Sequence, residues 1–79
     1  MNLWDLNVGR SALIDCVDSS DDSVKSTLES LGFYKNASVT CLSTTLFGGP
    51  RLYKISGERV CSLCDQSAKC INIKPKSEV

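Results

Sequence analysis

The residues of this chain best suited to chemistry are four of its five cysteines. Cys61 and Cys64 form a Cys-x-x-Cys pair, Cys70 follows nearby, and Cys41 lies on a separate predicted strand. A Cys-x-x-Cys turn can present two thiolates to one zinc or iron ion, and four thiolates complete a closed tetrahedral site. A small cysteine-based metal-binding protein, holding Zn2+ or Fe2+, is therefore one hypothesis for this sequence.

The pattern around the same cysteines also fits a simpler role. Alternation along residues 59–63 places Cys61 and Leu63 on one face of a strand. Free cysteine is among the most frequently buried residue types, and one Cys-x-x-Cys pair without a second pair is a weak metal signal. We therefore favour thiols packed in the core and expect no bound cofactor.

Two large apolar residues beside a glycine-rich turn are the candidate binding surface. Leu46 and Phe47 precede Gly48-Gly49-Pro50, which is typical of a hairpin loop, and a strand resumes at Arg51. Apolar residues at such a tip either form an exposed patch for a partner or fold back as a lid on the core, and the sequence leaves both open. The predicted protein-binding residues are Leu46, Phe47, Gly48, Gly49 and Arg51.

Composition excludes several classes of function. The chain has no histidine, the commonest general base, so we expect no enzyme. Its nine basic and nine acidic residues cancel, which argues against non-specific nucleic-acid binding. No segment approaches the run of about 20 apolar residues that a membrane span needs, and the N-terminus lacks the pattern of an export signal. We expect a cytoplasmic protein with reduced thiols.

A short helix is predicted upstream of residue 32. Apolar residues recur at helical spacing at Val24, Leu28 and Leu31, and serines and aspartates that can cap the first turn stand just before them. Gly32 is expected to end the helix in a left-handed conformation, which places Phe33 against Leu28.

The rest of the chain is predicted to be mainly strands. We expect strands over residues 11–17, 38–42, 51–55, 59–63 and 69–73, a single helical turn over residues 65–68, and a tether or turn over residues 3–9. Several short strands with tight turns indicate a small barrel or sandwich that removes exposed edges by closing on itself. The predicted organisation is one domain over residues 1–74 and a frayed tail over residues 75–79.

Several short motifs occur in an order that is informative as a whole. They are Leu3-x-Asp5-Leu6-x-x-Gly9, Ile14, Leu28-x-x-Leu31-Gly32-Phe33, Gly48-Gly49-Pro50, Leu63 with Ala68, and Ile71-x-Ile73. In order and spacing they resemble the FeoA family, small cytosolic proteins of bacterial ferrous iron uptake. Cys64 stands where the family commonly has an arginine, so any contact of that arginine is not carried over to this chain.

The resemblance implies both a fold and a role. It implies a five-stranded SH3-like barrel and an accessory or regulatory protein that binds the cytosolic part of a GTPase-permease for ferrous iron. Contact with a membrane would then come only through the permease, with no nucleic-acid partner, and a weak homodimer is left open. A stand-alone SH3-like domain of the iron-dependent repressor type is the alternative that the same resemblance implies.

Overall fold

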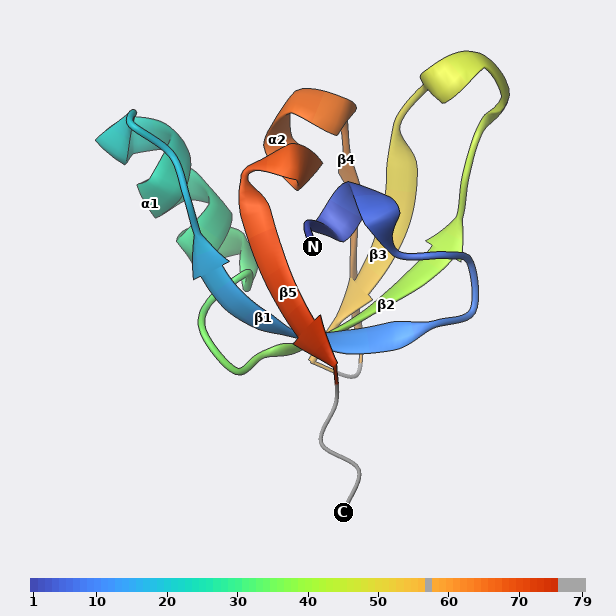
Figure 1. Cartoon of the computed structure of the whole chain (residues 1–79), viewed down its shortest axis with the longest axis horizontal. Helices are drawn as coiled ribbons and strands as arrows, with labels where there is room; N and C mark the ends of the chain where they lie inside the picture. The colour runs from blue at the N-terminus through green and yellow to red at the C-terminus, as the bar shows by residue number, and fades with distance from the viewer. Residues whose placement is uncertain (57, 76–79) are drawn as a thin grey trace.

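Short strands alternate with short helical segments along the chain (Figure 1). The computed structural model describes residues 1–56 and 58–75, apart from the side chain of Leu46. Its elements in order are η1 (Leu3–Asp5), β1 (Ser11–Val17), α1 (Asp22–Leu31), β2 (Ser38–Ser43), η2 (Leu46–Gly48), β3 (Arg51–Ile55), β4 (Arg59–Leu63), α2 (Asp65–Lys69) and β5 (Ile71–Pro75). The strands of this described part form one antiparallel sheet in the order β4-β3-β2-β1-β5, which confirms the predicted mainly-β fold with a helix between the first two strands.

Both ends of α1 follow from local sequence. The Asp21 side chain accepts a hydrogen bond of 2.9 Å from the amide of Ser23, which satisfies one of the unpaired first-turn donors. Gly32 has a φ of +114°, and its amide donates to Glu29 while the amide of Phe33 donates to Leu28. These two bonds make a Schellman motif, so the predicted helix stop is confirmed.

The core is built from the inward-facing side chains of the strands and from residues of η1, α1 and α2. Leu28 of α1 and Phe33 beyond its cap are buried, and Val24 is partly buried against them, whereas Leu31, the third residue of the predicted apolar stripe, is exposed because it lies in the last turn of the helix. The other fully buried large side chains come from η1 and the sheet, and they are Leu3, Ile14, Val39, Cys41, Tyr53, Ile55 and Ile71.

The sheet is not closed by strand pairing, which corrects the expectation of a closed cylinder. Among the described residues, no ladder joins β4 to β5, the two ends of the strand order. The N-terminus lies along β5 instead, because Asn2 bridges to Asn72 and the amide of Ile73 donates to the carbonyl of Met1 at 3.0 Å. The segment predicted as a tether is therefore an integral part of the fold, and Leu3 within it is fully buried.

The last strand begins and ends two residues later than predicted. Lys69 closes α2 and pairs with Asp65 one turn earlier at 3.8 Å, so the strand starts only at Ile71. Pro75, which we had assigned to the tail, ends β5 opposite Ala12. The remaining tail residues, 76–79, lie outside the described residues.

Candidate functional site

The tip of the β2–β3 hairpin presents Phe47 to solvent. Its side chain is fully exposed, at 102% of the reference value, so Phe47 is not a lid on the core. The loop is closed at its base by the hydroxyl of Thr45, which donates to the carbonyl of Pro50 at 3.2 Å. Leu46, the other predicted apolar contact, has a side chain outside the described residues.

The backbone at the tip is unusual for an aromatic residue. Phe47 adopts φ 64° and ψ 27°, and Gly48 follows with φ +72°. The left-handed region is disfavoured for side chains with a Cβ, by roughly 1–2 kcal/mol. Gly48 adopts the left-handed conformation without a steric penalty, as the predicted hairpin turn requires. The sequence did not predict the same conformation at Phe47. An exposed aromatic held in this conformation is typical of a binding surface rather than of a stabilising contact.

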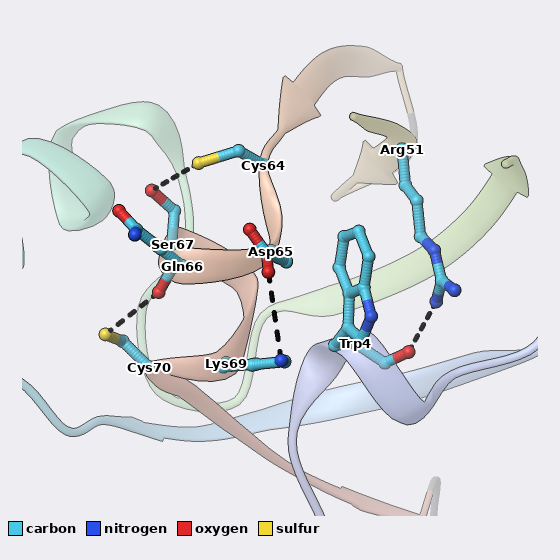
Figure 2. A network of polar contacts seen from close by, with 8 residues as sticks. All are labelled: Trp4, Arg51, Cys64, Asp65, Gln66, Ser67, Lys69 and Cys70. Atoms are coloured by element: carbon cyan, nitrogen blue, oxygen red, sulfur yellow. Dashed lines mark hydrogen bonds and ion pairs between the residues drawn. The ribbon is translucent and has the colours of Figure 1, made fainter. Parts of the chain in front are cut away.

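Arg51, which was predicted to contact a partner, is occupied inside the molecule. Its guanidinium carbon lies 3.9 Å from the centroid of the Trp4 ring, and its Nη1 donates to the backbone carbonyl of Trp4 (Figure 2). The planar guanidinium can stack on an aromatic face and donate in its own plane at the same time. Arg51 therefore anchors the base of the hairpin to η1, and Phe47 alone remains as the described large apolar contact at the tip.

Tyr53 and Cys41 form the buried layer beneath this anchor. Tyr53 is fully buried, and its hydroxyl donates to the carbonyl of Leu3 at 3.4 Å. Burial raises the pKa of the Tyr53 phenol and of the Cys41 thiol, and the nearby charge of Arg51 lowers both in part. Burial is the larger effect, so the Cys41 thiol stays protonated and packs as a small hydrophobe.

The strand register keeps two of the predicted metal ligands apart. Tyr53 pairs with Cys41 on one side and with Cys61 on the other, so a whole strand lies between the two cysteines. Cys61 is half-buried and packs against the core, in the manner that the alternation of its strand predicted.

The other two predicted ligands lie at opposite ends of α2 (Figure 2). Cys64 is exposed at the N-cap, with its Sγ 3.7 Å from the hydroxyl of Ser67, whereas Cys70 donates to the carbonyl of Gln66 at 3.3 Å. Hydrogen bonds from the amide and hydroxyl of Ser67 lower the pKa of Cys64. Within residues 1–56 and 58–75, no three His, Cys, Asp or Glu side chains converge as metal ligands would.

Sequence reasoning missed an apolar surface on the outside of the sheet. Leu42, Leu52 and Val60 are 40%, 39% and 49% exposed, and all three project from the face opposite the core. We call this the outer face of β2–β4. The alternation of inward and outward side chains along each strand could have indicated that these residues face outward. Only the register between the strands shows that the three side chains are neighbours.

A groove that the sequence did not indicate lies where α1 ends. It has a volume of about 400 Å³, and its lining includes Glu29, Tyr34, Ile55 and Arg59. Nη1 of Arg59 donates to the carbonyl of Leu31 at 3.3 Å, and thereby ties the start of β4 to the last turn of α1. The groove thus marks a junction of the fold with mixed charges, without a convergent set of functional groups.

The chain matches a protein-family model over most of its length. The model of the FeoA domain matches residues 1–75. This chain belongs to the FeoA domain family. The FeoA of Stenotrophomonas maltophilia complexed with zinc, described as a unique procaryotic SH3 domain protein, is 26% identical, with a TM-score of 0.81 over 94% of this chain and 89% of that one. The FeoA resemblance and the SH3-like fold are therefore confirmed.

Other FeoA and repressor structures share the fold. The solution structure of FeoA from Chlorobium tepidum is 22% identical, with a TM-score of 0.86 over 98% of this FeoA chain and 71% of that one. A manganese-dependent transcriptional repressor in complex with manganese is 18% identical, with a TM-score of 0.85 over 94% of this chain but only 35% of the repressor. No curated protein sequence matches the chain. No helix in the described part of the chain is long and apolar enough to cross a membrane.

Proposed function

We propose that this protein is a non-catalytic accessory protein of ferrous iron uptake, which acts by binding the cytosolic part of a ferrous iron permease. The family match over residues 1–75 supports the link to the Feo system. The role suggested for the Stenotrophomonas maltophilia relative, a bacterial ferrous iron transport activating factor, supports the link to iron transport. In this proposal the protein works in the cytoplasm and meets the membrane only through the permease.

The exposed hairpin tip is the observation that carries the proposal. Large aromatic side chains dominate the energetics of many protein interfaces, because burying them in a partner's pocket removes extensive apolar surface from water. Phe47 is fully exposed at the tip of the β2–β3 loop, so a partner's pocket can enclose its side chain.

The base of the hairpin supports the same role, because it limits the freedom of the tip. The Thr45–Pro50 hydrogen bond closes the loop, and the Arg51 anchor fixes it to η1. A loop that is already ordered loses less conformational entropy on binding, so more of the contact energy remains as affinity.

Replacing Phe47 tests the proposal. Phe47→Ala is expected to weaken binding to the permease's soluble cytosolic portion by about 2 kcal/mol or more, with little change in the thermal midpoint, because Phe47 contacts no core residue. Tyr34→Ala, which removes another half-exposed aromatic in the groove where α1 ends, is the matched control and should bind like wild type. Equal affinity of wild type and Phe47→Ala would refute the role of the tip, and no binding of wild type would refute the proposed function.

Two alternatives predict different behaviour. A cysteine-based metal carrier would hold stoichiometric zinc or ferrous iron after anaerobic purification and would lose it on combined Cys61→Ser and Cys64→Ser substitution. Because the four thiols are separated, we expect less than one metal ion per chain in the wild type. The double variant should then have the same metal content as the wild type. A domain of the repressor type would be encoded beside a DNA-binding domain, whereas our proposal expects a neighbouring permease gene.

A further inference from the structure

The outer face of β2–β4 is an exposed apolar surface that includes the two strands of the hairpin that carries Phe47. Ser43 pairs with Leu52, and the bulged residue Leu42 lies directly beside this pair. On the next strand Val60 is diagonal to Leu52, because Leu52 pairs with Ser62. Diagonal side chains on one face of a sheet are about 7–8 Å apart, so these three apolar residues are neighbours on that face.

One basic residue, Lys54, stands at the edge of this patch. Lys54 projects from the same face, and it pairs with Thr40 on one side and with Val60 on the other. The other basic residue of β3, Arg51, is engaged with Trp4, and Glu58, two residues before Val60, makes no ion pair with Lys54 within the described residues. Among residues 1–56 and 58–75, the structure gives Lys54 no ion pair.

We propose that Phe47 and the outer face of β2–β4 together form a docking surface for an apolar segment of the permease that carries a carboxylate opposite Lys54. This inference rests on the proposed function and names the chemistry of the partner's contact. Interfaces bury an apolar centre, and a charge at the edge of that centre selects a partner of opposite sign. The surface offers both features: three exposed aliphatic side chains and an unopposed ammonium group.

The charge of the surface favours an acidic protein segment over other occupants. A nucleic acid needs several basic side chains to displace the counterions of its phosphates, and this face presents one. Stable attachment to an anionic membrane also needs a cluster of basic residues beside the apolar ones. A second copy of this chain would bring a second Lys54 toward the first in a symmetric contact of the two faces, which is unfavourable.

Calorimetric titration of the full chain with the permease's soluble cytosolic portion tests the inference. We expect Lys54→Glu to weaken binding about tenfold or more, since like charges then oppose each other, and Leu52→Ser to weaken it by a similar factor. The affinity of wild type should fall with added salt, whereas the Lys54→Glu variant should bind better as salt rises. Lys35→Glu and Tyr34→Ser, which make the same changes on exposed residues away from this face, should bind like wild type.

Each alternative outcome is distinct. If Phe47→Ala weakens binding while Lys54→Glu and Leu52→Ser match wild type, the docking surface is overturned and the proposed function stands. If wild type fails to bind, both fall. A dimer in sedimentation that Leu52→Ser dissociates would assign the face to a second copy, and Lys54-dependent binding to vesicles of phosphatidylserine would assign it to a membrane. Lys54→Glu removes no buried contact, so it remains a valid test if Leu52→Ser does not fold.

Discussion

The guanidinium of Arg51 covers the ring of Trp4 at 3.9 Å and donates to the carbonyl of the same residue. This double contact joins the N-terminal 3-10 turn to the base of the β2–β3 hairpin (Figure 2). The hairpin tip is thus oriented by a residue 47 positions earlier in the sequence than Arg51. The loop that carries Phe47 is in this way attached to the core of the fold.

Substituting Arg51 with lysine tests this anchor. Lysine keeps the charge but lacks the planar group that stacks on an indole while donating in its plane, so Arg51→Lys should lower the free energy of unfolding by about 1 kcal/mol. Urea denaturation of both proteins measures this difference. Arg10→Lys, an exposed arginine elsewhere in the chain, should be neutral. An unchanged unfolding free energy in Arg51→Lys would show that the contact with Trp4 does not stabilise the fold.

The left-handed conformation of Phe47 predicts an inverted order of two variants. Phe47→Gly and Phe47→Ala both remove the aromatic ring, but only glycine adopts a φ near 64° without a penalty. Phe47→Gly should therefore be more stable than Phe47→Ala by roughly 0.5 kcal/mol, although glycine also gains entropy in the unfolded chain. Thermal melts compare the two. Greater stability of Phe47→Ala would mean that the tip does not hold this conformation in solution.

Alanine substitutions at two glycines with positive φ distinguish the cost of backbone strain from the cost of a steric contact. A Cβ on Gly32 would lie 3.3 Å from Cγ2 of Ile55, whereas a Cβ on Gly9 would meet no atom within 4 Å. Gly9→Ala should destabilise the protein by about 1 kcal/mol through backbone strain alone, and Gly32→Ala by about 2 kcal/mol because the packing against Ile55 adds to it. Chemical denaturation gives both values. Equal losses would show that Ile55 yields freely to the added methyl group.

The cysteines should differ in their reaction with an alkylating reagent. Because hydrogen bonds from Ser67 lower the pKa of Cys64, its alkylation should reach half its maximal rate below the ordinary thiol pKa, and Ser67→Ala should shift that midpoint upward. Cys41, buried and with a raised pKa, should react only after unfolding. Peptide mapping by mass spectrometry across a pH series follows each thiol. Rapid labelling of Cys41 in folded protein would contradict its burial.

The sequence predicted the features that depend on near neighbours. The stop of α1 at Gly32 follows from glycine's access to positive φ, and the strand composition of residues 51–55 and 59–63 predicted β3 and β4 at their observed bounds. The family resemblance added the SH3-like arrangement, which strand counting alone left between a barrel and a sandwich.

Features that depend on distant partners were not predictable in the same way. Leu3 looks like part of a tether until α2 and β5 are seen beside it. Arg51 resembles an exposed loop residue because its partner, Trp4, lies 47 positions earlier in the sequence. The outer face of β2–β4 depends on a register that a bulge at Leu42 shifts, and local alternation does not reveal such a shift.

The hydrogen bond between the amide of Ile73 and the carbonyl of Met1 has a consequence for biosynthesis. Met1 and Ile73, which meet on the β5 side of the sheet, lie far apart along the sequence, so Met1 is synthesised long before its partner. Contacts between such distant parts of a chain slow folding, because a long loop must close before they form. The nascent chain thus acquires its final stability only after Ile73 has been translated. An affinity tag fused directly ahead of Met1 would lie beside this late-forming contact between Met1 and Ile73.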